Sequence, residues 1–423
     1  MTTVEGWVAP GWEGVRSTFK HNFDSGSEVG AAFAAYHKGA KVVDLWGGVA
    51  DATTGRPWSE DTMVLVYSTT KGFTAMCANR LADEGALDVD APVCEYWPEF
   101  AQAGKEKITV ADLLSHRAGL AWVDGTMTVD EMLAWDPVIK ALESQAPSWT
   151  PRTAHGYHAT TYGWLVGEVV RRVSGRSLGT FLRDEIAGPL DADCFVGLPA
   201  AQEPRVARLV QFSAAELSQM AELAGSPKQT QRAPSAPATA PDSQPKSMIE
   251  TAFEFLGRDA PLVKALTAPG GALGERWIWD TPKLHAAELP AANGICDARA
   301  VARLYGSCVS DVDTGSNGMF RVLSPKQLDR ALVQQTEGPD SVLMGLDIQW
   351  GLGFMLNRGM IEEAKMGGPR AFGHFGMGGS IGWADPDSEL AIGYVMNKMS
   401  LGTTGDPRGF ALAQACVAAA RNG

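Results

Sequence analysis

The chain contains 423 residues, of which 45% are hydrophobic and 20% are charged, a composition near the globular average that allows a sizeable core in one large domain or two lobes. Its formal net charge of −13 argues against nucleic acid or an anionic membrane as a partner. The amino-terminal residues lack a basic region and an apolar run, and no later stretch reaches the length of a membrane span, so we expect a cytoplasmic protein.

Cysteine and histidine usage gives no sign of a disulfide framework or a metal site. The six cysteines have no paired spacing and fall mostly within apolar patterns, which predicts reduced, buried thiols. His155 and His158 lie three residues apart, but no carboxylate or cysteine is arranged to complete a set of metal ligands. We therefore expect neither a metal nor an organic cofactor.

The first elements of the chain predict a helix followed by a β-hairpin. Residues 11–23 have the apolar periodicity of an amphipathic helix. Two strand-like runs follow, 29–36 and 41–47, and Lys38 with Gly39 supplies the turn between them. This order indicates an antiparallel sheet that is covered on one face.

A serine and a lysine then stand three residues apart at the start of a helical pattern. The apolar segment 61–67 leads into Ser68, and apolar residues recur at helical spacing from Phe73 until Gly85. Residues three apart on a helix share a face, so Ser68 Oγ and Lys71 Nζ can meet. A serine hydroxyl needs a neighbouring base to become a good nucleophile, and lysine can act as that base only if burial or nearby positive charge keeps it neutral. The spacing alone is weakly specific, since a helix N-cap serine with a solvated lysine gives the same pattern.

The surrounding sequence is far more specific. Ser68-Thr69-Thr70-Lys71 is followed by Glu-Gly-Ala-Leu-Asp-Val-Asp-Ala-Pro-Val at 84–93 and by Ile-Thr-Val-Ala-Asp-Leu-Leu-Ser-His-Arg-Ala-Gly-Leu at 108–120. In combination these runs resemble the serine β-lactamase and penicillin-binding-protein superfamily, and most closely its class C β-lactamase-like branch, which includes the family VIII carboxylesterases. In that family the second run is a structural helix and turn, so the resemblance implies a scaffold role for His116.

The resemblance implies an α/β fold of the β-lactamase/transpeptidase type. Such a fold has an antiparallel sheet, formed by both termini and flanked by helices, and a mostly helical second lobe. The sheet lobe would comprise residues 1–75 and 300–423, with a closing helix over 408–421, and the helical lobe would comprise residues 76–299.

The resemblance also implies a tyrosine that opens a helix beside the serine. Tyr157 is the candidate, because apolar positions recur at helical spacing after it and end at Gly175. It would share a proton with Lys71, which requires a pKa well below the ordinary value of about 10. The segment is one residue longer than the usual pattern, so Tyr162 is an alternative. Ala159 stands where β-lactamases carry an asparagine that bonds the substrate amide, which weakens the case for turnover of β-lactams or peptides.

The second half of the helical lobe carries weaker signals. Residues 225–247 are rich in Pro, Ala, Ser and Gln, which predicts either a surface connection or a lid over the substrate, and helical patterns flank them at 214–224 and 248–266. Further on, Asp297 is placed to cap a helix. Asn293 either contacts the substrate or is a turn residue beside a glycine.

The last motif is glycine-rich and lies between two strand-like runs, at 372–383. Glycines in a strand fit a backbone that passes close to a ligand. By the resemblance, residues 374–376 occupy the place of the Lys-Thr-Gly triad of β-lactamases, and the backbone N–H groups of Met377 and Ser68 would form the oxyanion hole. The substrate contacts are then predicted at His374, Phe375, Gly376, Trp383 and Asn293. Five tryptophans would either line a pocket near the cleft or pack the core: Trp122, Trp135, Trp149, Trp350 and Trp383.

The replacement of the triad lysine bears on the substrate. His374, with an ordinary pKa of about 6.5, is mostly neutral at pH 7 and cannot supply fixed charge to a substrate carboxylate. Together with Ala159, it favours small, neutral esters over anionic amides. The sequence therefore predicts a serine hydrolase that cleaves small carboxylic esters through an acyl-enzyme on Ser68, with Lys71 and Tyr157 moving the proton. The alternatives are a β-lactamase or D-amino-peptidase type of amidase, an acyltransferase with the same acyl-enzyme, and a binding protein without catalysis.

Overall fold

The computed structural model describes residues 2–210, 256–273, 278–315, 318–360, 364–400 and 405–422. The Pro-rich segment 225–247 and the helix expected at 214–224 lie outside these ranges. Of the helix expected at 248–266, the described part contains α10 (Pro261–Thr267). Among the described residues, no helix is long and apolar enough to cross a membrane.

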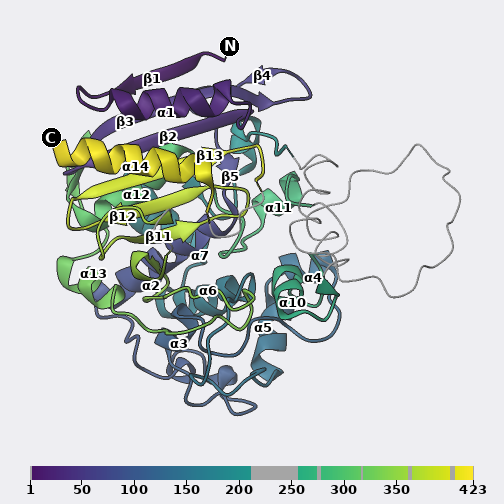
Figure 1. Ribbon diagram of the computed structural model, residues 1–423. Helices are drawn as coiled ribbons and strands as arrows, with labels where there is room; N and C mark the ends of the chain where they lie inside the picture. Colours follow the sequence, from purple (N-terminus) through teal and green to yellow (C-terminus); the bar gives the residue numbers. More distant parts are fainter. Residues whose placement is uncertain are drawn as a thin grey trace, which may run out of the picture.

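An antiparallel sheet forms the upper half of the molecule (Figure 1). Within the described ranges it has eight strands, in the order β1 (Val4–Val8), β3 (Ala40–Asp51), β2 (Gly30–His37), β13 (Leu390–Met396), β12 (Ile381–Asp385), β11 (Phe372–Phe375) and β10 (Met355–Leu356), with β4 (Arg56–Pro57) paired to β3. The central pair, β2 with β13, joins the two ends of the chain and sets Ala32 opposite Val395. This confirms the predicted sheet built from both termini.

The predicted hairpin is present between β2 and β3. Its turn residues Lys38 and Gly39 have φ angles of 52° and 78°. Two consecutive positive φ angles are typical of a type I′ turn, whose twist matches that of the strands it joins.

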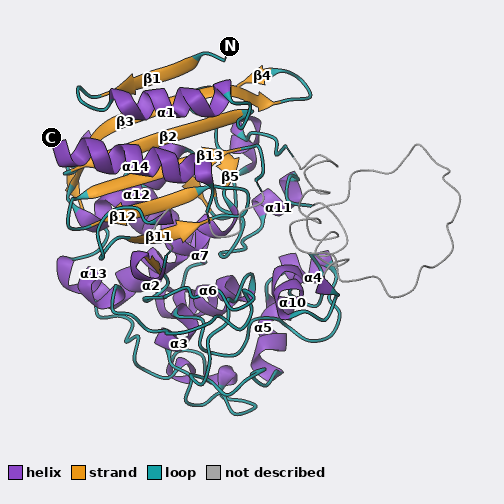
Figure 2. Ribbon diagram, in the orientation of Figure 1, coloured by secondary structure: helices purple, strands orange, loops and turns teal. Residues whose placement is uncertain are grey.

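Helices cover both faces of the sheet, not one face as the sequence suggested (Figure 2). α1 (Glu13–Asp24) and α14 (Pro407–Asn422) pack together on one face, and α12 (Ala298–Val309) lies on the other. Consecutive strand residues point to opposite faces. Gly393 of β13 accordingly lies against the α12 backbone, whereas Tyr394 contacts α14. The predicted cap of α12 is confirmed, since Asp297 Oδ1 accepts a hydrogen bond of 2.7 Å from the N–H of Ala300.

The lower half of the molecule is mostly helical. Its elements are α2 (Thr70–Asp83), α3 (Val110–Leu114), α4 (Val129–Leu133), α5 (Asp136–Ser144), α6 (Thr161–Ser174), α7 (Leu178–Leu182), α10, α11 (Pro282–Ala286) and α13 (Pro325–Ala331). Two small sheets complete the fold, one of β5 (Val64–Leu65), β7 (Ile295–Cys296) and β6 (Cys194–Phe195), and one of β8 (Val312–Asp313) and β9 (Met319–Phe320). The bounds proposed for the two lobes stay a prediction.

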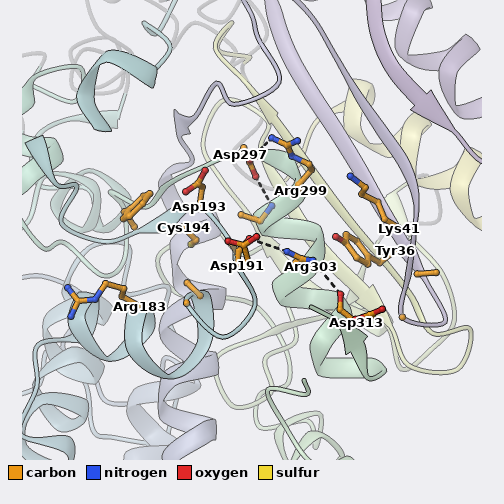
Figure 3. A pocket seen from close by; sticks show the side chains of 17 residues that line it. Tyr36, Lys41, Arg183, Asp191, Asp193, Cys194, Asp297, Arg299, Arg303 and Asp313 are labelled. Carbon is orange, nitrogen blue, oxygen red and sulfur yellow. Dashed lines mark hydrogen bonds and ion pairs between the residues drawn. The ribbon is translucent and has the colours of Figure 1, made fainter. Parts of the chain in front are cut away.

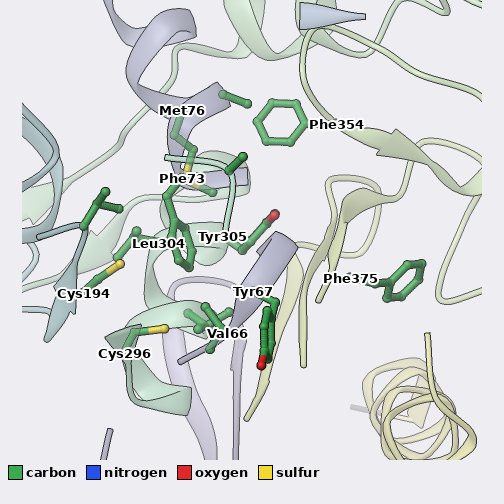
Figure 4. Packing of buried hydrophobic residues seen from close by; sticks show 14 of the residues in the cluster. Val66, Tyr67, Phe73, Met76, Cys194, Cys296, Leu304, Tyr305, Phe354 and Phe375 are labelled. Carbon is green, nitrogen blue, oxygen red and sulfur yellow. The ribbon is translucent and has the colours of Figure 1, made fainter. Parts of the chain in front are cut away.

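α2 is the buried helix that links the two halves. It packs against α6 on one side, and its residue Gly72 has no room for a side chain, because a Cβ there would lie 2.0 Å from the Tyr305 hydroxyl of α12. Figure 4 shows Phe73 and Met76 of α2 within the buried cluster that also contains Tyr305 and Phe354. The start of α2 is therefore held firmly beneath the sheet.

Candidate active site

Ser68 lies at a sharp turn between strand β5 and helix α2. A single turn of 3₁₀ helix, Tyr67–Thr69, connects the two elements. Tyr67 has a φ of 44°, a strained value for a residue with a side chain, and its ring packs on Trp279 at a centroid distance of 5.1 Å. Its neighbours in the turn are buried, whereas Ser68 is partly exposed. The turn thus presents the serine hydroxyl at the surface of an otherwise buried segment.

Lys71 is fully buried and points at this hydroxyl. Its Nζ lies 3.0 Å from Ser68 Oγ, 2.7 Å from the carbonyl oxygen of Ala159 and 2.9 Å from that of Ala291. Carbonyl oxygens only accept hydrogen bonds, so Nζ donates to both of them. Burial lowers the pKa of Lys71 well below 10.5. A neutral lysine amine has two N–H bonds and one lone pair. Because both N–H bonds donate to these carbonyls, the lone pair is free to accept the Ser68 proton.

The carbonyl of Ala291 is placed by a loop that is bonded to the serine turn on both sides. The Gly294 N–H donates to Thr70 Oγ1 over 2.8 Å, and the Gly294 carbonyl accepts the N–H of Val66 at 2.9 Å. Val66 and Thr70 precede and follow Ser68. These two bonds fix the loop to the turn that carries Ser68, so the Ala291 carbonyl holds the Lys71 amine in a constant position relative to Ser68.

Asn293, in the same loop, is not a substrate contact, which corrects the sequence prediction. Its side chain is fully buried. Oδ1 accepts the N–H of Leu289 at 2.9 Å, and Nδ2 donates to the carbonyls of Leu284 at 2.9 Å and Ala287 at 2.6 Å. All these amide hydrogen bonds are made within the loop, which agrees with the alternative role of Asn293 as a turn residue.

Tyr157 joins the serine and the lysine from the other half of the chain. Its hydroxyl lies close enough to the Ser68 hydroxyl for that group to lower the pKa of the phenol, and its ring centroid lies 4.8 Å from Lys71 Nζ. The ring stacks on Trp350 at 5.7 Å and 12°, and the Tyr157 N–H donates to Asp340 Oδ1 at 3.1 Å. Burial raises the pKa of Tyr157 above 10, and the nearby Ser68 hydroxyl partly offsets this rise. The expected lowering of this pKa is therefore wrong, because the neighbouring amine is itself desolvated and Tyr157 stays a neutral phenol.

Tyr162, the alternative, lies in the interior of the helical region. It is the second residue of α6, which begins at Thr161, four residues after Tyr157, where the sequence suggested that the helix starts. Its side chain is fully buried, its hydroxyl has no hydrogen-bond partner among the described residues, and its ring packs on His116 at 5.2 Å. Only Tyr157 of the two is placed beside Ser68 and Lys71.

Three buried histidines surround the cluster and are held neutral. His116 Nδ1 accepts the N–H of His158 at 3.1 Å, and His158 Nε2 accepts the N–H of Leu120 at 3.0 Å. His374 Nδ1 donates to the Phe375 carbonyl at 2.7 Å. Burial lowers the pKa of His374 to about 3 and that of His158 to about 4. Among the described residues, no three His, Cys, Asp or Glu side chains are grouped to hold a metal ion.

Residues 376–380 close against the turn that carries Ser68. A Cβ at Gly376 would lie 2.1 Å from the Val66 carbonyl, so only glycine allows this approach. Ser380 Oγ donates to the same carbonyl at 2.8 Å and lies 3.0 Å from Thr69 Oγ1. These contacts bring Met377 to the turn that carries the serine. The Met377 N–H has no acceptor among the described residues.

Phe375 and Trp383 face away from this cluster, which corrects two predicted substrate contacts. Their rings stack on each other at 5.3 Å and 14°, and Phe375 also meets Phe410 of α14 edge-on at 5.7 Å. Trp383 Nε1 donates to the Met366 carbonyl at 2.9 Å. The cause is strand alternation, since His374 of β11 points to the side of Tyr157 and the next residue points to the opposite face.

The other tryptophans divide between the site and the core. Trp350 reaches the cluster through its stack on Tyr157. Trp122 and Trp149 pair edge-on at 6.3 Å, while Trp135 donates from Nε1 to the buried Glu168 at 2.9 Å in the helical region. One ring of the five therefore contacts a candidate catalytic side chain directly.

A separate cavity of about 680 Å³ opens between the β2–β3 turn and the start of α12 (Figure 3). None of the candidate catalytic residues lines it. Its two partly buried arginines are bound within the protein: Arg299 pairs with Asp297 at 3.1 Å, and Arg303 donates to the carbonyls of Leu190 at 2.6 Å and Asp191 at 3.0 Å. We do not assign it to the reaction.

The site combines a serine at a strained strand-to-helix turn, a desolvated lysine one helical turn later and a tyrosine from a distant loop. Placed beneath an antiparallel sheet, this combination defines a serine hydrolase of the β-lactamase/transpeptidase type. The Beta-lactamase family profile matches residues 15–416. The chain belongs to this family.

Several relatives are similar over most of the chain. Esterase/beta-lactamase LipL of Mycobacterium tuberculosis is 34% identical over 377 residues, which cover 88% of this chain and 77% of that protein. The crystal structure of a family VIII carboxylesterase is 35% identical with a TM-score of 0.79 and covers 99% of this chain and 100% of that one. A penicillin-binding-protein homologue from Caulobacter crescentus is 35% identical with a TM-score of 0.78, at the same coverage.

Proposed function

We propose that the protein is a carboxylesterase that cleaves small, neutral esters through an acyl-enzyme on Ser68. The observation that carries the proposal is the Lys71 amine, which is buried, held by two backbone carbonyls and 3.0 Å from the serine oxygen. The names of two similar proteins, an esterase/beta-lactamase and a family VIII carboxylesterase, support the same class of reaction.

In the acylation step, neutral Lys71 takes the proton of Ser68 while Oγ attacks the ester carbonyl carbon. The carbonyl π-electrons move to oxygen, and the backbone N–H groups of Ser68 and Met377 stabilise the resulting oxyanion. The oxyanion then collapses, the bond to the alkoxy oxygen breaks, and the leaving alcohol takes a proton.

Tyr157 is the group that delivers this proton. Its neutral phenol lies beside Ser68 and its ring faces Lys71 Nζ, so with substrate bound it is placed to donate to the alkoxy oxygen and to be reprotonated by the ammonium of Lys71. Water then attacks the acyl-enzyme, with the same groups acting in reverse, and releases the carboxylic acid. The starting protonation states are restored.

The substrate class follows from the groups that surround the cluster. Ala159 offers a carbonyl to Lys71 and no side-chain amide to a substrate, and His374 is held neutral by burial. Neither group attracts a carboxylate, which favours neutral esters. We also propose a reducing, cytoplasmic location, because all six cysteines are free thiols.

Intact-mass spectrometry after treatment with a fluorophosphonate tests the nucleophile. Wild-type protein should gain one adduct and Ser68→Ala should gain none. A labelled Ser68→Ala protein, or an unlabelled wild type, would refute the proposal. The unlabelled result is the one expected for a binding protein without catalysis.

A substrate panel separates the esterase from its two rivals. We expect p-nitrophenyl acetate to be turned over with a much higher kcat/KM than a chromogenic cephalosporin, and a reversed order would identify a β-lactamase. Addition of a small alcohol at fixed ester should leave the rate of acid formation nearly unchanged. A new ester product that grows with the alcohol would identify an acyltransferase.

A further inference from the structure

A buried arginine at the start of α14 contacts the loop that carries Met377. Arg408 is 7% exposed. Its Nη1 donates to Glu28 Oε2 at 2.9 Å and to the Ser27 carbonyl at 3.0 Å, while Nε and Nη2 each donate to the Asp406 carboxylate at 2.9 Å. Nη2 also donates to the carbonyl oxygen of Gly378 at 3.0 Å. Both Nη atoms also donate to the Lys398 carbonyl at 3.2 Å. The two carboxylates therefore fix a guanidinium whose Nη2 reaches the 376–380 loop.

From Gly378, two planar peptides lead to the N–H of Met377. The carbonyl that accepts from Arg408 shares its peptide with the N–H of Gly379, which donates to the Gly376 carbonyl at 3.1 Å. That carbonyl shares its peptide with the N–H of Met377. In a trans peptide the C=O and N–H point in opposite directions, so the chain of bonds aims the Met377 N–H away from Arg408.

The backbone angles of the loop require glycine at two consecutive positions. Gly378 and Gly379 have φ angles of 88° and 125°, a region that favours glycine. A Cβ on Gly379 would lie 3.0 Å from Arg408 Nη2 and 3.0 Å from Asp406 Oδ2. The ionic cluster thus meets the bare backbone of the loop, with no side chain between them.

We propose that Arg408 is a positioning residue for the oxyanion hole, which it orients and polarises through the peptides of Gly378 and Gly376. The inference rests on the proposed esterase function. Aligned hydrogen bonds in a water-poor interior polarise one another, so a cation at one end makes the N–H at the other end a stronger donor. Arg408 does not touch the substrate.

The test is the Arg408→Lys variant, assayed with p-nitrophenyl acetate and with its thionoester, in which sulfur replaces the carbonyl oxygen. Lysine keeps the charge but cannot bond both carboxylates and the Gly378 carbonyl at once. We expect kcat to fall about 10- to 100-fold, less than the loss of about 10²–10³ on removal of a whole donor. KM should stay unchanged, and the ester-to-thionoester ratio of kcat/KM should fall with kcat, because an oxyanion hole favours oxygen over sulfur.

Arg303→Lys is the matched control. Arg303 also bonds backbone carbonyls of a neighbouring loop, at Leu190 and Asp191, but it lies at the separate cavity of Figure 3. This variant should keep the wild-type kcat and the wild-type thionoester ratio. An equal loss in both variants would mean that general destabilisation, not the loop, explains the effect, and would overturn the inference.

Asp406→Asn keeps the size and shape of the side chain and serves if Arg408→Lys does not fold. It removes the carboxylate that orients Nε and Nη2, so the thionoester ratio should again fall. A folded variant with the wild-type kcat and ratio would refute the positioning role while Ser68 labelling and ester turnover stand. Loss of ester turnover and labelling in the wild type would instead refute the proposed function.

Discussion

The Nζ atom of Lys71 donates a hydrogen bond of 2.7 Å to the backbone carbonyl of Ala159, a residue 88 positions later in the chain. A second carbonyl, of Ala291, takes another Nζ proton. The lysine is thereby turned toward Ser68 by two loops that only the folded chain brings together. This arrangement suits a neutral amine, and the following predictions depend on it.

Lys71→Arg should abolish most of the activity. A guanidinium is charged at every accessible pH and cannot accept the serine proton. We expect kcat/KM for p-nitrophenyl acetate to fall about 10³-fold, within the range of about 10²–10⁴ that a general base contributes. Thermal unfolding of the variant checks that the fold is kept, and activity near the wild-type level in a folded variant would rule out Lys71 as the base.

Tyr157→Phe should affect esters according to their leaving group. The change removes the hydroxyl but keeps the ring that stacks on Trp350. An alkyl ester needs its leaving alcohol protonated, so kcat should fall about 10²-fold, whereas p-nitrophenolate leaves unprotonated and its ester should lose less. Tyr162→Phe is the matched control and should leave both rates unchanged. Equal losses for both esters would contradict the role of Tyr157 as proton donor.

The pH dependence of kcat/KM should report the lysine. Because burial lowers the pKa of Lys71 well below 10.5 and the base acts when deprotonated, activity should rise with pH and reach a plateau well before pH 10. His374, whose pKa burial lowers to about 3, stays neutral from pH 5 to 9. His374→Asn should therefore keep the shape of the profile, whatever its height. A profile that still climbs at pH 10 would show an unperturbed lysine.

Glu28 should make the protein less stable as the pH rises. Burial raises the pKa of Glu28 from 4.5 to about 7, with Arg408 opposing the shift, so between these values the folded state binds more protons than the unfolded state. The stabilising contribution is full below pH 4.5 and is lost as the pH passes 7, a change of about 3 kcal/mol. Urea unfolding of wild type and Glu28→Gln at several pH values measures it.

The contrast between the two proteins isolates this group, since all other titrating residues are shared. The free energy of unfolding of Glu28→Gln should vary less between pH 4.5 and 7 than that of the wild type. Parallel curves would mean that the pKa of Glu28 is not raised in the folded protein.

Local sequence patterns predicted the elements that form through interactions between residues near one another in the chain. The hairpin at Lys38 and Gly39 and the cap at Asp297 follow from the conformations that those residues favour. The Ser68 and Lys71 contact needs only one helical turn, and the family resemblance depended on consecutive residues around it. Each of these features involves neighbours in the chain, which a sequence displays directly.

Contacts across the fold decided the rest. The sequence was enough to propose Ser68 and Lys71 as the catalytic pair and to recognise the family, because short segments carry them. Only the tertiary structure separated Tyr157 from Tyr162, turned Trp383 to the far face of its strand and enclosed Asn293 within its loop. It also set Arg408 behind the 376–380 loop, since burial and hydrogen bonding between distant segments depend on how the whole chain packs.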